Sequence, residues 1–209
     1  MEQFVTLQAV AAPLIEPNVN TDDILPSVWV LNANTNLGEK LFANRRYGAD
    51  GRETQNFVLN QEPFRRAQIL LSGPNFGCGS SREAAVWALR QFGIRCIVAP
   101  SFGDIFYENC FQNGVLPILL PAERIGEIVG SLNQSQDKTL RVDLQTCRLG
   151  ADDLGDIQFE VTPQRRSALL LGQDAMSQLL GWTSEVEAYE KDDCAARPWI
   201  YLGPRNQGG

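Results

Sequence analysis

Residues 69–99 read ILLSGPNFGCGSSREAAVWALRQFGIRCIVA. Two apolar runs, 69–71 and 94–99, have the length and the continuous hydrophobicity of buried strands. The alanine-rich segment 81–92 between them has the apolar spacing of a helix, and Gly93 stands where helices commonly end. Parallel strands need a crossover of this kind, because a short turn would reverse the chain. The stretch therefore predicts a strand, loop, helix and strand with parallel pairing, and it places the chain in the α/β class.

The loop of this unit, residues 74–83, carries the strongest functional signal in the chain. Gly77 and Gly79 allow the backbone to turn sharply and leave amide groups uncovered. Ser80 stands three residues before Glu83, which is the spacing of a capping box. We therefore expect the helix to begin at Ser80 or at the serine that follows it.

A helix terminus at this position would gather several anion-binding groups. Free amides and the positive end of the helix dipole would lie beside the hydroxyl of Ser81 and the guanidinium of Arg82. Two nucleotide-binding motifs do not match the loop. Arg82 occupies the place of the third glycine of the dinucleotide-binding motif G-x-G-x-x-G, and the lysine of a phosphate-binding P-loop is missing. The loop predicts a site for a small carboxylate or phosphate. Two alternatives stay open: a helix start without a ligand, and a reactive thiol at Cys78.

The chain has five cysteines and no histidine. The cysteines are widely spaced and form no C-x-x-C pair, so we expect reduced thiols, no disulfide framework and no metal site. The absence of histidine removes the commonest general base and the usual metal ligand. Any proton chemistry therefore needs another base or another subunit.

The amino-terminal part of the chain predicts a strand over 3–10 and a loop over 13–26. In that loop Thr21 and Asp22 are either turn formers or a second polar cluster that reaches the anion site. The arginine pair 165–166 precedes a helical segment and is typical of a solvated or capping pair. A second arginine would nonetheless suit a dicarboxylate.

Residues 27–61 show no sustained helical or strand periodicity in their apolar residues. We therefore expect a long irregular excursion from the sheet, with short helical pieces around 38–46. The aromatic segment 101–107 predicts core or a subunit contact. Pro117 should push its strand to a sheet edge, because proline cannot donate to the ladder. The remaining predicted elements are helices over 101 or 103 to 112, 122–132, 165–171, 175–180 and 184–191, strands over 115–120, 140–144 and 157–161, and a tail over 198–209.

Composition limits the classes of partner. The chain has 209 residues, and 25 acidic residues against 18 basic ones give a formal net charge of −7. With no basic run, this charge disfavours a nucleic-acid surface or an anionic membrane as the partner. The first twelve residues lack a basic flank, and no apolar stretch approaches the length of a membrane span. We expect a cytoplasmic protein.

Five segments together resemble a known family. They read NVNTDDILP at 18–26, FVLN at 57–60, NFGCGSSRE at 75–83, APSFGDIFY at 99–107 and AYE at 188–190. They resemble the small subunits of 3-isopropylmalate dehydratase, which are similar to the swivelling carboxyl-terminal domain of aconitase. The resemblance implies one swivelling β/β/α domain over 1–197, with a partly parallel sheet flanked by helices. It further implies a mobile substrate loop at about 28–60, before the tail.

The function implied by the resemblance is that of one subunit of a hydro-lyase in leucine biosynthesis. It would isomerise 2-isopropylmalate to 3-isopropylmalate by dehydration and rehydration, within a heterodimer or heterotetramer. This chain would bind no cofactor, since a [4Fe-4S] cluster would lie on the large subunit. Matched residue by residue, Ser80 is the implied base that removes the carbon-bound proton. The implied substrate-binding residues are Ser81, Arg82, Gly79, Cys78, Thr21 and Asp22, and the implied substrate-selecting residues are Val30, Leu31, Asn32 and Asn34.

The chain departs from the family pattern in two places. Ala84 stands where the family commonly has histidine, and residues 28–36 lack the arginine often found there. An apolar loop suits the isopropyl group of isopropylmalate, whereas citrate or homocitrate would require another cation. A related hydratase for citramalate or homocitrate is the first alternative. A non-catalytic anion-binding or regulatory domain is the second.

Overall fold

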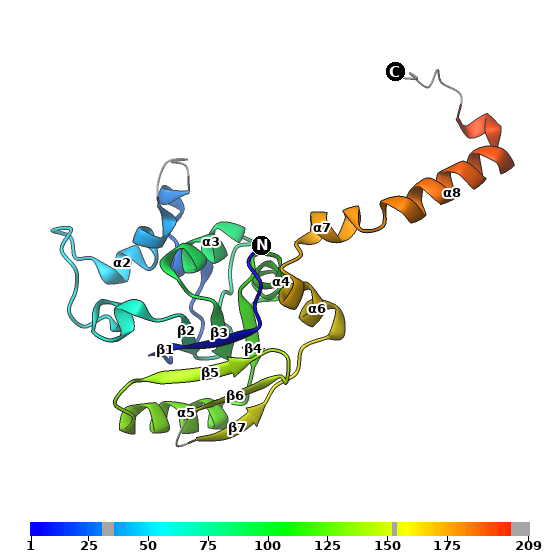
Figure 1. Ribbon diagram of the computed structural model, residues 1–209. Coiled ribbons are helices and arrows are strands. Elements are labelled where there is room, and N and C mark those ends of the chain that lie inside the picture. Colours follow the sequence, from blue (N-terminus) through cyan, green and yellow to red (C-terminus); the bar gives the residue numbers. More distant parts are fainter. Residues whose placement is uncertain (31–35, 152–153, 202–209) are drawn as a thin grey trace.

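The computed structural model describes residues 1–30, 36–151 and 154–201. Its centre is a mixed sheet of seven strands in the order β4-β3-β2-β1-β5-β6-β7 (Figure 1). β1 pairs in parallel with β2 and antiparallel with β5, so it joins a parallel half to an antiparallel half. The strands are β1 (Thr6–Leu14), β2 (Ile69–Ser72), β3 (Cys96–Ala99), β4 (Leu116–Leu119), β5 (Thr139–Asp143), β6 (Arg148–Ala151) and β7 (Leu154–Gln158).

The parallel half confirms the predicted unit. β2 is followed by helix α3 (Glu83–Phe92) and by β3, which pairs in parallel with β2. Both strands are fully buried, as their continuous apolar sequence predicts. Helix α4 (Asp104–Gln112) leads to β4 at the sheet edge, where Pro117 was expected to place it.

The antiparallel half was predicted less well. β6 was missed, and the last strand was placed at 157–161, whereas β7 ends at Gln158. β6 has only four residues and contains Gly150, whose missing Cβ would lie 2.9 Å from Asp156 Oδ1. Such a strand is stabilised by pairing with its neighbours, and it is too short to show an alternating apolar pattern in the sequence. The first strand was predicted at 3–10 but continues to Leu14, because its second half pairs with β2.

The core consists of two apolar clusters, one on each face of the sheet. Successive β2 residues alternate between them, since Leu70 belongs to one cluster and Ile69 and Leu71 to the other. α3 and the excursion after β1 cover the first face. Helix α5 (Ala122–Gln134) covers the second, as Figure 1 shows.

The excursion, residues 27–66, contains short helical turns, of which η2 packs on α3. They are η1 (Ser27–Trp29), η2 (Leu37–Lys40), α2 (Ala43–Arg46), η3 (Val58–Asn60) and η4 (Phe64–Arg66). η2 lies against the end of α3, because Gly38 lets its backbone approach: a Cβ there would meet the Gln91 backbone at 2.6 Å. The predicted helical pieces around 38–46 are confirmed.

The predicted loop over 13–26 needs a correction. Residues Thr21–Ile24 form a short helix, α1. Asn20 caps it: the Asp23 amide donates to Asn20 Oδ1 at 2.8 Å, and the Asn20 amide donates to Asp23 Oδ2 at 3.1 Å. This is a capping box, a motif that the sequence predicted only for the later glycine loop.

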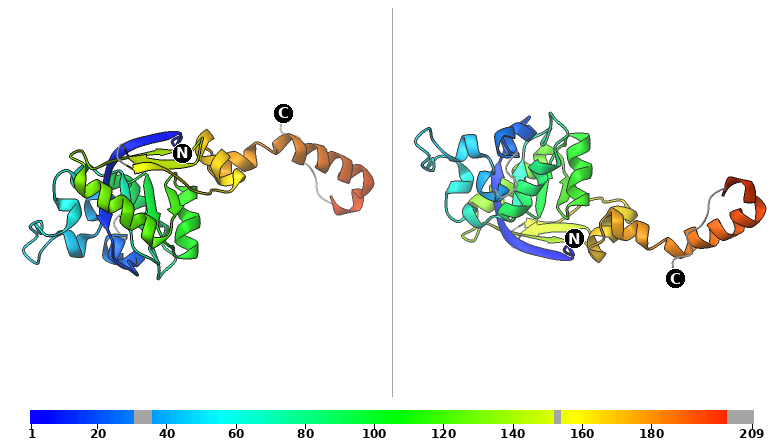
Figure 2. Two further views of the ribbon diagram at one scale, coloured as in Figure 1. Left: turned by 90° about the horizontal axis from the view of Figure 1, so that it is seen from below. Right: turned by 90° about the horizontal axis from the view of Figure 1, so that it is seen from above.

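The carboxyl-terminal helices confirm the prediction and extend it. α6 (Pro163–Leu171) and α7 (Ala175–Leu180) lie where expected, and α8 (Thr183–Ala196) runs beyond the predicted end at 191. Pro198–Ile200 forms a 3₁₀ turn at the start of the predicted tail. α7 and α8 point away from the body in each view (Figures 1 and 2). Among the described helices, none has the length and apolarity needed to cross a membrane.

Candidate active site

Three loops meet at the carboxyl edge of the parallel strands. They follow β1, β2 and β3, and short backbone bridges join them: Asn20 pairs with Cys78, and Phe76 with Phe102. The Gly77 amide donates to the Val19 carbonyl at 2.7 Å. The three loops thus continue the parallel sheet beyond the strands, at the edge where open α/β sheets bind ligands.

The glycines of the middle loop are required by both conformation and space. Gly77 has φ of +72°, and a Cβ there would overlap the Phe106 ring at 2.1 Å. Gly79 has φ of +92° and faces the Thr21 hydroxyl. The predicted sharp turn is confirmed. Phe106 packs edge-on against Phe76, with ring centroids 5.4 Å apart, so the aromatic segment 101–107 contributes core beneath the loop.

The expected helix start was wrong. α3 begins at Glu83, and Arg82 before it is extended, with φ of −116° and ψ of 108° and no side-chain cap. The Arg82 amide donates to the Ser80 carbonyl at 2.8 Å, so the two serines lie in a turn before the helix. Both serine residues are exposed to solvent. Neither hydroxyl caps α3.

α1 supports this turn through two side chains. Thr21 is buried, and its hydroxyl donates to the Ser80 carbonyl at 2.9 Å. The next residue, Asp22, forms an ion pair with Arg82. Among the predicted substrate-binding residues, Thr21 therefore lies beneath the turn, whereas Asp22 lies beside the guanidinium.

The guanidinium of Arg82 is only partly satisfied by this pair. Its Nη2 donates to Asp22, while Nη1 is buried and has no hydrogen-bond partner among the described residues. The hydrogen bond from Arg82 holds the pKa of Asp22 below its ordinary value. An unsatisfied charged donor is costly, so this nitrogen favours an anion that reaches it.

A hydrogen-bonded trio at the start of α3 was not predicted. Asn113 donates through Nδ2 to Glu83 Oε1 at 2.8 Å, and Trp87 donates through Nε1 to Asn113 Oδ1 at 3.0 Å. Glu83, the one acidic residue in the first turn of α3, is thereby tied to the end of α4. Nothing local in the sequence marks Asn113, because it joins the trio only through the packing of two helices.

Ala84 and the cysteines complete the surroundings of the loop. Ala84, where the family commonly has histidine, is buried in the core. All five cysteines are free; Cys78 is partly exposed in the loop, whereas Cys96 and Cys110 are buried, and burial raises the pKa of both thiols. The described residues contain no group of three or more side chains suited to hold a metal ion.

The segment that was predicted to select the substrate is only partly described. Val30 follows η1 and is exposed, while Leu31, Asn32 and Asn34 lie outside the described residues. Beyond this gap, the Leu37 amide donates to Gln91 Oε1 at 2.7 Å. α3 thus connects the base of the segment at one end with the serine turn at the other.

The arginine pair 165–166 is engaged elsewhere in the body. Arg165 pairs with Glu108 and lies over the Tyr107 ring, with Cζ 5.2 Å from its centroid. Arg166 donates to the Leu144 carbonyl at 3.0 Å. These contacts join α6 to α4 and to the end of β5. Both arginine side chains therefore have a structural role in packing α6.

Comparisons with known proteins give a consistent result. The aconitase C-terminal domain family matches residues 1–123. The 3-isopropylmalate dehydratase small subunit of Paramagnetospirillum magneticum is 45% identical over 201 residues, covering 96% of this chain and 100% of the relative. The protein of the same name from Gluconobacter oxydans is 45% identical and covers 96% of each chain. A solved structure, the 3-isopropylmalate dehydratase (leuD) of Methanocaldococcus jannaschii, has a TM-score of 0.63 at 22% identity and covers 89% of this chain and 99% of its own; this likeness concerns the fold.

Proposed function

Because this chain belongs to the 3-isopropylmalate dehydratase small-subunit family, with the aconitase C-terminal domain fold, we propose that it is one subunit of a hydro-lyase in leucine biosynthesis. The reaction is the isomerisation of 2-isopropylmalate to 3-isopropylmalate by dehydration and rehydration. The resemblance drawn from the five sequence segments and the predicted fold class are thereby confirmed.

One arrangement carries the proposal for the site: two solvent-exposed serines beside a partly satisfied guanidinium, in the turn before α3. Arg82 has one nitrogen without a partner among the described residues, and this nitrogen suits a substrate carboxylate. Ser81, adjacent and exposed, supplies a further donor to the same carboxylate. Ser80 then lies next to the carbon chain of the substrate.

Ser80 is the proposed base. Its oxygen takes the proton from the substrate carbon, and the electron pair of the broken C–H bond forms the double bond as hydroxide leaves the neighbouring carbon. A serine hydroxyl is too weak a base in water, so its ionised form must be stabilised by amides and arginine in a dry site. In this chain Ser80 is exposed, so the dry environment has to come from a partner that covers it. We therefore propose that the chain alone is inactive.

The partner is the proposed large subunit, in a heterodimer or heterotetramer. The cysteines of this chain do not suit a cluster, because two of them are sealed in the core and the described residues contain no metal-binding group. A [4Fe-4S] cluster on the large subunit would supply the Lewis acid for the leaving hydroxyl. This chain contributes the residues that hold the carboxylate and move the proton.

One observation favours a substrate with an apolar substituent. Val28 and Val30, which lead into the proposed substrate-selecting segment, are both exposed. An isopropyl group suits these neighbours better than the additional carboxylate of homocitrate.

Turnover measured with a panel of substrates tests this proposal. The purified chain, the large subunit of the same organism with its cluster reconstituted, and their mixture are each supplied with 2-isopropylmalate, citramalate and homocitrate. We expect turnover only in the mixture, with the highest kcat/KM for 2-isopropylmalate. A preference for another acid would favour the related hydratase, and an assembled pair without turnover on any acid would favour the non-catalytic anion-binding domain.

A further inference from the structure

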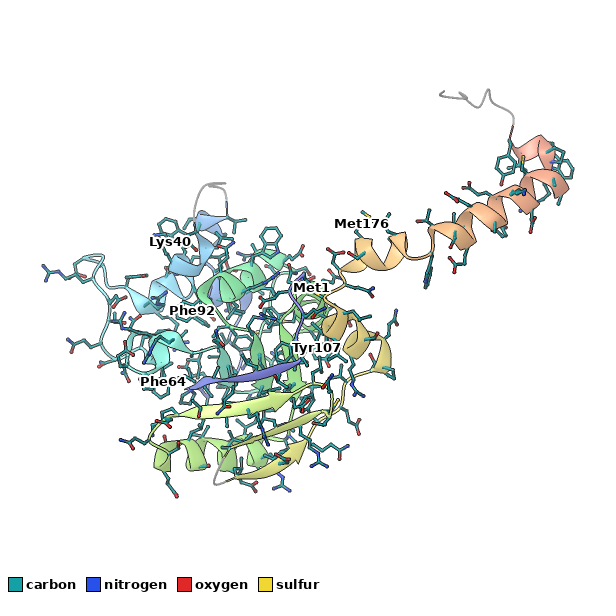
Figure 3. The ribbon with its side chains drawn as sticks, in the orientation of Figure 1. Met1, Lys40, Phe64, Phe92, Tyr107 and Met176 are labelled. Atoms are coloured by element: carbon teal, nitrogen blue, oxygen red, sulfur yellow. The ribbon has the colours of Figure 1, made fainter. Side chains whose placement is uncertain are left out.

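The carboxyl-terminal arm, residues 173–201, carries an unusual share of the exposed apolar surface. Fifteen large apolar side chains are exposed among the described residues, and eight of them lie in this arm. Figure 3 shows Met176 on α7, clear of the body, and Figure 2 shows the arm projecting from it. The eight are Met176, Leu179, Leu180, Trp182, Val186, Tyr189, Trp199 and Ile200.

Three of these side chains form a stripe that begins at Trp182, the residue before α8, and continues along the helix. Trp182, Val186 and Tyr189 are spaced by four and three residues, so they lie on one face of the helix. Their exposed fractions are 65%, 51% and 64%, and with Glu185 they line a shallow hollow. α8 buries none of its fourteen residues, all of which the structure describes. A row of large apolar side chains normally faces a core, and here the body does not cover it.

The arm has little of its own to stabilise it. Isolated helices of this length are marginal in water, because the cost of nucleation is offset only by tertiary packing. At the end of α8, Asp193 forms an ion pair with Arg197, four residues further along the chain. A large contiguous apolar patch on a soluble protein commonly marks a protein interface. The arm therefore has the properties of a segment that packs against another chain.

The root of the arm, by contrast, is fixed to the body. The terminal ammonium of Met1 donates to the Gly172 carbonyl at 2.9 Å, and the Phe4 amide donates to the Leu169 carbonyl at 2.9 Å. Gly172 ends α6 with φ of +67°, and a Cβ there would lie 2.7 Å from the Met1 carbonyl oxygen. The segment that leads into the arm is thus held beside β1.

The net negative charge of the arm favours a different protein, rather than a second copy of this chain, as its partner. The arm contains six acidic residues, Asp174, Glu185, Glu187, Glu190, Asp192 and Asp193, against the basic residues Lys191 and Arg197. Two arms packed together would bring like charges into one interface, which costs free energy. A partner with an apolar groove and a basic rim would complement both the stripe and its acidic flanks.

We propose that the arm docks its Trp182, Val186 and Tyr189 face into an apolar, basic-rimmed groove of the large subunit, and so joins the two subunits. This inference rests on the proposed function for the identity of the partner. Tryptophan and tyrosine at the centre of an interface commonly carry most of its binding free energy.

Affinity for the large subunit tests the proposal. The full chain carrying Trp182→Ala, Val186→Ser and Tyr189→Ala is titrated with the large subunit by isothermal calorimetry. The matched control carries Ser184→Ala, Glu187→Ala and Lys191→Ala, three exposed changes on the opposite face that leave the net charge unaltered. We expect the stripe variant to raise Kd by roughly 100-fold or more, and the control to stay within about twofold of wild type.

Hydrogen exchange provides a second measurement that does not depend on a substitution. The α8 amides of the wild-type chain should exchange quickly alone and slowly with the large subunit present. Unchanged affinity of the stripe variant, or unchanged exchange of α8, would overturn the proposal. So would self-association of the chain that the stripe variant abolishes, or protection of α8 in the monomer.

These experiments test the arm inference separately from the proposed function. Calorimetry is done without substrate, so its result does not depend on turnover. A pair that binds through the arm but isomerises no acid contradicts the proposed function and leaves the arm inference standing. An active pair whose affinity does not depend on the arm contradicts the arm inference and leaves the proposed function standing.

Discussion

The carboxylate of Asp22 pairs with the guanidinium of Arg82 across 60 positions of the chain. Asp22 lies in the first turn of α1, and Arg82 lies at the residue before α3. The pair joins the loop after β1 to the loop after β2, so a side chain from one segment orients the proposed anion-binding group of the other.

Asp22→Asn should weaken substrate binding more than it slows the chemical step. The amide keeps the shape of the carboxylate but loses its charge, so Arg82 is held less firmly. We expect KM of the subunit pair to rise roughly tenfold with a smaller change in kcat. Steady-state kinetics should be compared with Asp137→Asn, an exposed site in a loop of the opposite half of the sheet. An unchanged or lower KM would show that Asp22 does not position Arg82 for substrate.

The same pair makes stability depend on pH at the acidic end. The hydrogen bond from Arg82 lowers the pKa of Asp22 from 3.8, so the folded state favours the ionised carboxyl. This contribution is present above pH 3.8 and is lost as pH falls through the lowered folded value. The gap in Tm between wild type and Asp22→Asn should therefore be largest near neutral pH and shrink below pH 3.8. Scanning calorimetry from pH 7 to about 3 measures it, and a constant gap would contradict the assignment.

Gly77→Ala should destabilise the chain strongly. The new methyl group would overlap the Phe106 ring at 2.1 Å, and the backbone has a φ that alanine tolerates poorly. We expect a loss of about 3 kcal/mol or more in the free energy of unfolding, measured by urea denaturation. Gly126→Ala is the matched control, because its Cβ would meet open space on the exposed side of α5; it should stabilise by up to about 1 kcal/mol. Equal effects at the two glycines would remove the steric argument for the loop.

Asn60→Ala should lower the free energy of unfolding, because Asn60 links separate parts of the excursion. The buried Asn60 accepts from Arg46 Nε at 3.0 Å and donates to the carbonyls of Arg46 and Thr54 at 2.7 and 2.9 Å. Removing it leaves a buried guanidinium and two carbonyls short of partners, which costs about 2–3 kcal/mol. The urea midpoint of unfolding measures this loss, with the exposed Asn133→Ala as control. A loss no larger than that of the control would mean that water replaces the network.

The strand, loop, helix and strand at 69–99 could be predicted because each part carries a local signal. Continuous apolar runs mark the strands, and Gly93 marks the helix end with φ of +118°. The first residue of α3 could not be predicted in this way. Two segments have cap spacing, Asn20 with Asp23 and Ser80 with Glu83, and only the first uses it. The choice depends on Thr21 and Asp22, which hold the second segment in a turn through contacts distant in sequence.

The remaining failures have the same physical origin. β6 is too short to carry a period and is defined by β5 and β7 on either side. The link from Asn113 to Glu83 depends on how α3 meets α4. The stripe of α8 was predicted correctly as helix, but an apolar stripe in a sequence does not reveal whether the chain itself covers it.

Ser80, in the turn before α3, is the proposed base for a reaction completed by a second subunit. The most direct test is kcat for 2-isopropylmalate of the reconstituted pair carrying Ser80→Ala, with the exposed Ser167→Ala on α6 as control. We expect a loss of about 100-fold to 10,000-fold in kcat for Ser80→Ala, an unaltered Kd for the large subunit, and wild-type turnover for the control. Near wild-type turnover of the Ser80→Ala pair would contradict the proposed role of Ser80.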